Sequence, residues 1–259
     1  MTQPIAIGSR REVCWDEALI DTAENIRVQM HTPEYRGEVM HWDMPWEGTG
    51  AGCLSLIPDG DLQRMYYVGS EMDVDAAGNE RLRPAVMCCA ETTDGVHFTR
   101  SQINERSFSG IAQNNLLPTP GGVSLAIFRD TNPACPETER YKALCGDFAG
   151  QHDSLWLFVS ADGIHFEKQR ILIEDGAFDS LNTVFWDNAT QQYFLFYRGY
   201  HGFATDGDKP LAWTTPPKIE TEADLEIQIH CLGLVRDVRV RTSPDLVTWS
   251  APQRLDFGD

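Results

Sequence analysis

Three short segments of this sequence share one pattern: TTDGVHF at residues 92–98, SADGIHF at 160–166 and SPDLVTW at 243–249. In each segment a small residue is followed two positions later by aspartate and, four positions after that, by an aromatic residue. Aspartate caps a tight turn with its side chain, and glycine supplies the positive φ that many such turns require. The pattern therefore predicts the same β-hairpin in all three places.

Strand-like runs precede each hairpin segment in the same order. An aromatic-rich run and, further upstream, a shorter apolar run recur in every copy, as expected for β-strands. The aromatic runs are QRMYYVGS (63–70), ERYKALCG (139–146) and QYFLFYRG (192–199), and the shorter ones are CLSLI (53–57), VSLAIF (123–128) and TVFW (183–186). Each unit thus reads as a four-stranded antiparallel meander. Three such units in series predict an all-β fold of the β-propeller type.

The repeat also sets the boundaries of the units. Glu47 precedes the turn residue Asp94 by 47 residues, Asn115 precedes Asp162 by 47, and Asp179 precedes Asp245 by 66. We therefore expect Glu47, Asn115 and Asp179 to open their units. The predicted arrangement is a single, partial propeller domain over residues 1–259, with N-terminal strands in 1–44 and blades over 45–111, 112–176 and 177–255.

Composition narrows the class of partner. The 259 residues carry a net charge of −18, which disfavours nucleic acid and anionic membrane surfaces as partners. The first 30 residues show no apolar signal-peptide core, so a cytoplasmic location is expected. The seven cysteines form no CxxC pair and no metal-ligand spacing. We interpret them as buried, reduced thiols, and we expect neither a metal site nor a cofactor.

Several motifs, in this order, resemble a known family. They are EVCWDEALI, VQMHTPE, PWEG, NN, RYKAL, SADGIHF, FDSLN, FWD, YFLFYRG and RVRTSPD. Together they resemble the five-bladed propeller glycoside hydrolases of the invertase, levansucrase and arabinanase type, and more closely a bacterial glycosyl-hydrolase-like branch. The resemblance implies a carbohydrate as partner. Since three blades fit in this chain, it also implies a longer parent chain, blades supplied by a partner, or an open stack that self-associates through its edges.

The resemblance implies where the chemistry lies. In the related enzymes the first three blades each deliver one carboxylate to the central channel, and glycoside cleavage needs two of them, an acid and a nucleophile or base. Carried over, Glu47 becomes the base or nucleophile and Asp179 the general acid. The second position holds Asn114 or Asn115, which cannot ionise and would bind substrate. Asp43 lies close by in the sequence and is an alternative carboxylate.

Further substrate-binding candidates have structural alternatives. Trp46 could stack on a sugar ring or simply pack in the core. Arg198 and Arg239 could bind a carboxylated sugar or form salt bridges between blades. Glu47 could cap a loop, and Asp179 could stabilise a turn. Asp130 aligns with the hairpin-loop residue Asp187, and we interpret it as structural.

Two functions therefore remain open. The first is a glycoside-hydrolase-like protein that binds or hydrolyses a glycoside in the central pocket. The second is a propeller that binds sugars or partners without catalysis, or an inactive product of a longer gene.

Overall fold

The computed structural model describes residues 6–8, 19–27, 29–74, 78, 80–119, 125–146, 154–178, 181–202, 205–206, 209–210 and 234–256. The chain divides into two units, Met1–Glu38 and Val39–Asp259. The described residues before β1 form no strand, so the N-terminal strands predicted in 1–44 do not occur there. In the first unit Ile26, Met30 and Tyr35 are 70%, 94% and 79% exposed, so these apolar side chains gain little from burial.

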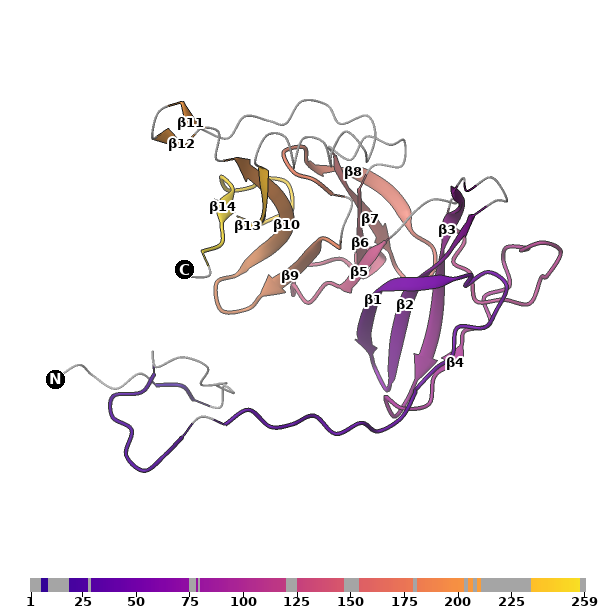
Figure 1. Ribbon diagram of the computed structural model, residues 1–259, viewed down its shortest axis with the longest axis horizontal. Coiled ribbons are helices and arrows are strands. Elements are labelled where there is room, and N and C mark those ends of the chain that lie inside the picture. Colours follow the sequence, from indigo (N-terminus) through magenta and orange to yellow (C-terminus); the bar gives the residue numbers. More distant parts are fainter. Residues whose placement is uncertain are drawn as a thin grey trace. The chain divides into compact units, whose positions relative to one another are not determined.

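Three four-stranded antiparallel sheets make up the second unit, each a meander in chain order (Figure 1). The first consists of β1 (Gly50–Asp59), β2 (Leu62–Val74), β3 (Glu80–Thr92) and β4 (Thr99–Arg100). The second consists of β5 (Ala126–Arg129), β6 (Tyr141–Gly146), β7 (Leu155–Ser160) and β8 (Glu167–Ile173). The third consists of β9 (Thr183–Asp187), β10 (Gln192–Gly202), β13 (Leu234–Ser243) and β14 (Gln253–Arg254).

These sheets are the three predicted meanders, and they confirm an all-β fold of four-stranded antiparallel blades. The remaining described elements are a two-stranded sheet and a short 3-10 helix: β11 (Thr205–Asp206), β12 (Lys209–Pro210) and η1 (Glu137–Glu139). No helix in the described part of the chain is long and apolar enough to cross a membrane.

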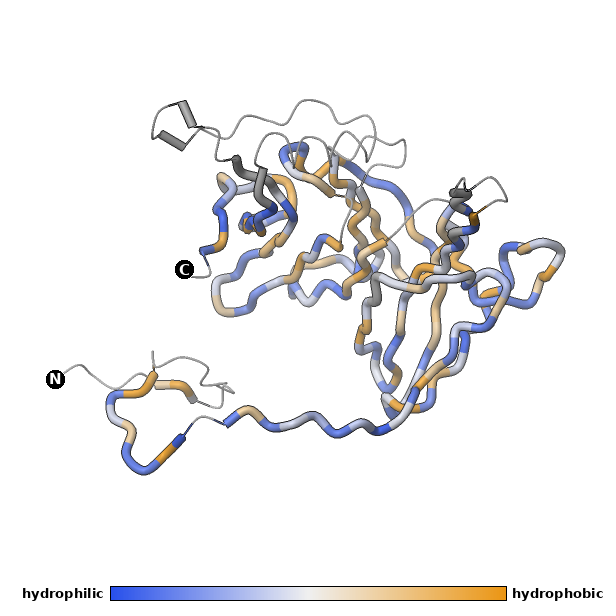
Figure 2. The backbone as a smooth tube through the Cα atoms, viewed as in Figure 1, coloured by the Kyte–Doolittle hydropathy of each residue, from blue (hydrophilic) through white to orange (hydrophobic). Residues whose placement is uncertain are grey.

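Neighbouring sheets pack face to face through alternating apolar residues. Tyr66 and Met87 of the first sheet join Ile127 of the second in one buried cluster. Leu157 on the second sheet joins Leu195 on the third in another. Successive residues of a strand point to opposite faces, which lets a blade contact both neighbours. Figure 2 shows the resulting mixture of hydrophobic and hydrophilic positions along these strands.

The three hairpin segments adopt the predicted capped turn. The Asp94 carboxylate accepts hydrogen bonds from the backbone N–H groups of Val96 and His97 at 2.9 and 2.8 Å. The bonds from the His97 ring and from these amides hold the pKa of Asp94 below its usual range. Asp162 and Asp245 accept the corresponding backbone bonds at 2.8–2.9 Å. The interpretation of these aspartates as turn residues is thus confirmed.

The residue after each turn aspartate has a positive φ. The values are 73° at Gly95, 77° at Gly163 and 60° at Leu246. The third copy therefore keeps the same backbone without glycine. Leu246 is only 3% exposed and belongs to the cluster between the second and third sheets, so burial offsets the strain.

Alanine substitution at two of these turns gives a matched prediction. Gly95→Ala is expected to lower the free energy of unfolding by about 1 kcal/mol, because alanine disfavours positive φ. Gly163→Ala is expected to lower it by about 2–4 kcal/mol, because its Cβ would also lie 2.6 Å from the Tyr66 hydroxyl oxygen. Urea unfolding of both variants checks this. Equal losses would show that the hairpin does not contact Tyr66.

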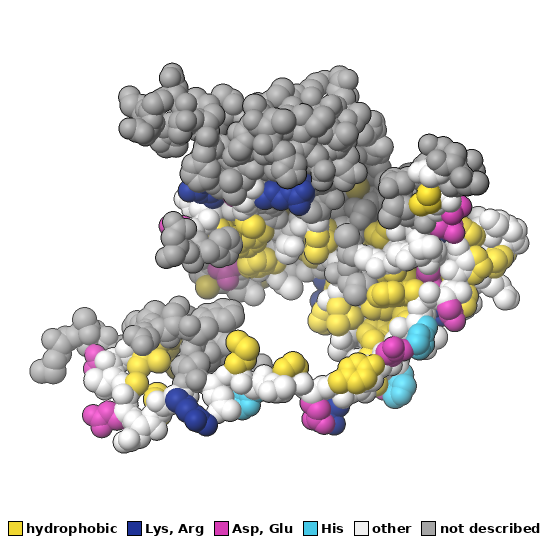
Figure 3. All heavy atoms as spheres, viewed as in Figure 1, with side chains coloured by type: hydrophobic (Ala, Val, Ile, Leu, Met, Phe, Trp, Pro, Cys, Tyr) yellow, Lys and Arg dark blue, Asp and Glu magenta, His cyan; other side chains and the backbone are white. Residues whose placement is uncertain are grey.

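Some apolar residues of the sheets remain exposed. Figure 3 shows hydrophobic side chains gathered over β1 and β2, where Leu56 and Val74 are 54% and 58% exposed. On the third sheet, Phe185 is 45% exposed and stacks on Phe194, with ring centroids 5.8 Å apart. Self-association through open faces or edges stays a prediction.

Candidate functional site

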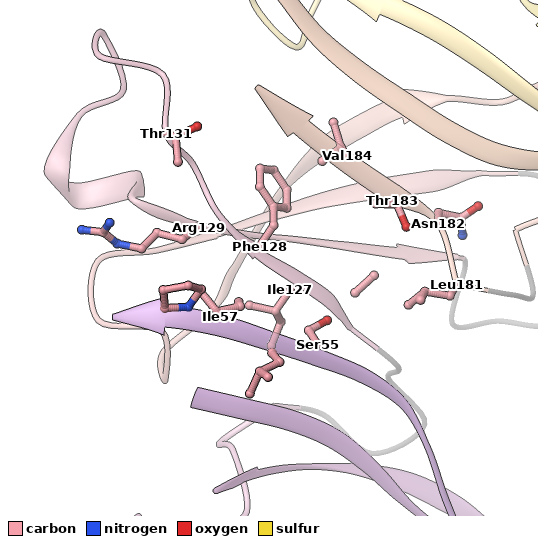
Figure 4. A pocket seen from close by; sticks show the side chains of 13 residues that line it. Ser55, Ile57, Ile127, Phe128, Arg129, Thr131, Leu181, Asn182, Thr183 and Val184 are labelled. Atoms are coloured by element: carbon pink, nitrogen blue, oxygen red, sulfur yellow. The ribbon is translucent and has the colours of Figure 1, made fainter. Parts of the chain in front are cut away.

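A cavity of about 380 Å³ lies along the first strands of the three sheets (Figure 4). β1 lies next to β5, and β5 lies next to β9. The walls of the cavity come from three segments: Ser55–Pro58 on β1, Ala126–Arg129 on β5, and 181–184 at the start of β9. Thr131, just after β5, also lines the cavity. We call this cavity the axial cavity.

The axial cavity offers both polar groups and apolar surface. Each of β1, β5 and β9 is the edge strand of its sheet, so one side of its backbone is unpaired within the sheet. Hydroxyl and amide groups come from Ser55, Thr131, Asn182 and Thr183. Figure 4 shows Arg129 and Thr131 at one end of the cavity and Asn182 and Thr183 at the other. Apolar side chains such as Phe128 and Leu181 complete the lining.

The predicted base or nucleophile, Glu47, is fully buried and does not line this cavity. One carboxylate oxygen accepts bonds from the Tyr67 hydroxyl at 2.6 Å and from Arg100 Nε at 2.9 Å. The other accepts bonds from Arg100 Nη2 and the Met44 backbone N–H, both at 2.9 Å. Arg100 thus binds the carboxylate bidentately, and both of its oxygens are occupied.

Trp46 and Asn115 belong to the same buried network. The Trp46 indole N–H donates to Asn115 Oδ1 at 2.8 Å. The Asn115 amide donates to the Tyr67 hydroxyl and to the Cys89 carbonyl, both at 2.8 Å. Burial raises the pKa of the Tyr67 phenol, which keeps its proton on the oxygen and lets it donate to Glu47. Because these partners occupy both ends of the Asn115 amide, the network stabilises the end of the first sheet.

Glu47 and Asn115 are not equivalent in the fold, although each lies 47 residues before its turn aspartate. The Glu47 carbonyl accepts from Ser70 of β2, so Glu47 extends the line of β1. The Asn115 carbonyl accepts from Cys89 of β3, so Asn115 lies on the β4 side of that sheet. The expectation that both residues open a blade is therefore wrong for Asn115, because its segment joins the sheet before it.

Asn114 and Asp43 also have protein partners. The Asn114 amide nitrogen donates to the carbonyls of Ile111 and Ala112, both at 3.2 Å, and its side-chain oxygen accepts from the Leu116 backbone at 3.1 Å. These bonds fix the 103–117 loop. Asp43, whose side chain is 66% exposed, pairs with Arg100 at 2.9 Å. Asp43 therefore meets Glu47 only through their shared arginine.

The remaining predicted residues lie elsewhere. Arg239 is 6% exposed and pairs with Asp237 at 2.9 Å on its own strand. Arg198 lies on β10 of the same sheet, opposite Val238 of β13. Asp179 falls outside the described residues. The assignments of Glu47 and Asp179 as catalytic residues stay predictions.

A second buried ion pair occupies the connection between β5 and β6. The Asp130 carboxylate, which is fully buried, binds Lys142 Nζ at 2.8 Å, and the lysine side chain is 4% exposed. Tyr193 of β10 donates to the same carboxylate oxygen at 2.8 Å. The other oxygen accepts from the Asn132 backbone at 2.9 Å. Asp130 therefore ties this connection to the third sheet, in agreement with a structural role.

Four cysteines, Cys88, Cys89, Cys135 and Cys145, are buried and form no disulfide, as predicted for them. Burial raises the pKa of the Cys88 thiol to about 12, so it remains protonated at neutral pH. No group of His, Cys, Asp and Glu residues that could hold a metal ion occurs among the described residues.

The sequence did not predict two groups of residues in these sites. Tyr67 and Arg100 join the predicted residues into one network, but nothing in the runs QRMYYVGS and HFTR singles them out. The sequence also did not predict the lining of the axial cavity, which comes in part from the runs CLSLI and VSLAIF. Only the three-dimensional arrangement shows which of their residues face the cavity.

No protein-family model and no curated protein matches this chain. Among solved structures it is similar to the GH32 beta-fructofuranosidase BmSUC1 of Bombyx mori, at 12% identity and a TM-score of 0.42, over 79% of this chain and 38% of that one. It is similar to a glycosyl hydrolase from Bacteroides ovatus, at 14% identity and a TM-score of 0.37, over 78% of this chain and 50% of that one. It is also similar to the beta-1,2-mannobiose phosphorylase of Listeria innocua, at 12% identity and a TM-score of 0.42. That match covers 80% of this chain and 59% of the other.

This chain therefore spans about 38–59% of the length of these three structures. The similarities assign no residue a role, and the fold class given above stands on the strand pairing itself. By that pairing, the chain consists of antiparallel four-stranded blades whose first strands line a cavity.

Proposed function

We propose that this protein binds a glycoside in the axial cavity. The observation that carries the proposal is the cavity itself, which the first strands of three sheets line with mostly apolar side chains and a few polar ones. Sugars present hydroxyl groups around the ring edge and C–H groups on the ring faces. Edge-strand backbone groups and the side chains of Thr131 and Thr183 can bond to the hydroxyls, and Phe128 and Leu181 can pack on the ring faces.

The proposal favours binding over cleavage by Glu47. Glycoside hydrolysis needs two carboxylates on either side of the scissile bond. The described residues that line the axial cavity include no carboxylate, and Glu47 is buried with both oxygens occupied. The network around Glu47 supports a structural role for this residue.

Hydrolysis remains a second candidate because of the sequence around Asp179. Leu181 and Asn182, two and three residues after it in the sequence, line the axial cavity. Aryl glycosides and oligosaccharides incubated with the wild type, Glu47→Gln and Asp179→Asn distinguish the two candidates. Turnover by the wild type that Asp179→Asn abolishes would make the protein a hydrolase, and absence of turnover together with binding supports the first proposal.

Blocking the axial cavity tests the binding proposal. Thr183 is exposed, lies on β9 and lines the cavity. Thr183→Trp is expected to weaken oligosaccharide binding at least about tenfold, since the larger side chain fills space that the sugar needs. Isothermal titration with a panel of oligosaccharides measures this effect.

The matched control is Thr99→Trp, which places the same side chain on an exposed threonine of β4 outside the cavity lining. We expect this variant to bind like the wild type. Equal affinities for wild type and Thr183→Trp, or no binding to any sugar of the panel, would contradict the proposal.

A further inference from the structure

Among the described residues that line the axial cavity, Arg129 is the only ionisable one. It is the last residue of β5, where its backbone pairs with Tyr141 of β6. Its side chain is exposed. The cavity therefore carries a positive charge at one end, in a protein whose net charge is −18.

The guanidinium of Arg129 makes no hydrogen bond or ion pair with any residue that the structure describes. Other arginines of the sheets do have such partners: Arg64 pairs with Asp59, Arg100 with Glu47 and Arg241 with Asp175. An arginine at a cavity, with its donors available, is the group that binds carboxylate or phosphate oxygens with two parallel hydrogen bonds.

Nearby acidic residues are already engaged. Asp130, the next residue in the chain, is buried against Lys142. Glu137 pairs with Arg140, and that pair holds the pKa of Glu137 below its usual range. These partners leave the Arg129 guanidinium available to a ligand. Thr131, which also lines the cavity at this end, adds a hydroxyl that can bond to the same ligand group.

We infer that the axial cavity takes a glycoside with an anionic substituent, a carboxylate, phosphate or sulfate, which Arg129 binds. The inference rests on the proposed function, because it assigns the ligand class of the same cavity. An acidic protein repels anions over its surface as a whole, so a local cation is needed to hold an anionic sugar. A bond to a charged group contributes more than a neutral one, which gives the site its selectivity.

The test compares one neutral sugar with three anionic ones: glucose with glucuronate, glucose 6-phosphate and glucose 6-sulfate. Ligand-observed NMR titrations at low and high salt give the affinities. We expect at least one anionic sugar to bind about tenfold more tightly than glucose at low salt, and the advantage to shrink at high salt. The arm with the largest advantage identifies the anionic group.

Arg129→Gln is expected to remove about tenfold or more of the affinity for that anionic sugar and to leave glucose binding unchanged. The control is Arg254→Gln, which removes an exposed arginine of β14 outside the cavity lining. It should change neither affinity. Thermal unfolding of Arg129→Gln should remain close to that of wild type, because Arg129 loses no hydrogen bond or ion pair and only a screened attraction to the exposed Glu137.

The outcomes separate this inference from the proposed function. Equal binding of neutral and anionic sugars, reduced by Thr183→Trp but not by Arg129→Gln, overturns the inference and leaves the proposed function standing. An anionic preference that Arg254→Gln removes as well as Arg129→Gln also overturns it. Absence of binding by every probe overturns both.

Discussion

Arg100→Met is expected to lower the free energy of unfolding by about 3–5 kcal/mol. The substitution leaves the fully buried carboxylate of Glu47 without its cation, and an uncompensated buried charge is strongly destabilising. The Tyr67 hydroxyl and the Met44 amide remain as donors, but neither carries a charge. Urea unfolding followed by tryptophan fluorescence measures the loss.

A double-mutant cycle controls for the size of the lost side chain. Glu47→Gln in the Arg100→Met background removes the stranded charge, so the double variant should be more stable than Arg100→Met alone. Arg100→Met within about 0.5 kcal/mol of wild type would show that the Glu47 carboxylate reaches solvent. That result would return Glu47 to the catalytic candidates. Activity assays of Glu47→Gln need its unfolding midpoint measured alongside, so that instability is not taken for lost chemistry.

Lys142→Met is expected to have an effect of similar size, about 3–5 kcal/mol. Lys142 is the cation that neutralises the buried Asp130, which also accepts a hydrogen bond from Tyr193 of the neighbouring sheet. Without it, the connection between β5 and β6 holds an unpaired charge beside the third sheet. Denaturant unfolding reports the global loss, and hydrogen exchange shows whether β5 and β10 lose protection together.

The matched rescue is Asp130→Asn combined with Lys142→Met. The neutral amide can still bond to Tyr193, so the double variant should regain part of the lost stability. A double variant less stable than Lys142→Met alone would mean that Asp130 does not depend on Lys142. The structural role assigned to this pair would then be wrong.

Much of the fold could be predicted from local patterns. The turn at Asp94 recurs at Asp162 and Asp245, and each capped turn is satisfied within five residues of chain. Strand patterns such as YFLFYRG could be identified for the same reason, since alternation and aromatic content are local properties. The N-terminal strands predicted in 1–44 do not occur among the described residues, where the apolar side chains of Ile26, Met30 and Tyr35 are exposed and not packed in a core.

The site was predicted only in part. Trp46, Glu47 and Asn115 do come together, through Tyr67, but in a buried network and not in the lining of the axial cavity. Their chemistry differs from the expectation, because Arg100 arrives from the strand after the first hairpin and occupies the Glu47 carboxylate. A sequence shows that a carboxylate is present but not which cation it meets, and that partner decides whether the carboxylate is available to a substrate.

The sequence by itself determined the repeat, the turns and the order of strands, because hydrogen bonds and side-chain alternation within a few residues dictate them. Only the tertiary structure decided which residues face the axial cavity and which are used up in the core. That distinction depends on packing between sheets: it buries Glu47 against Arg100 and pairs Asp130 with Lys142, whereas Arg129, one residue away from Asp130, stays exposed at the cavity. Residues next to each other in the chain can have opposite roles, because the partners that bury one of them come from distant strands.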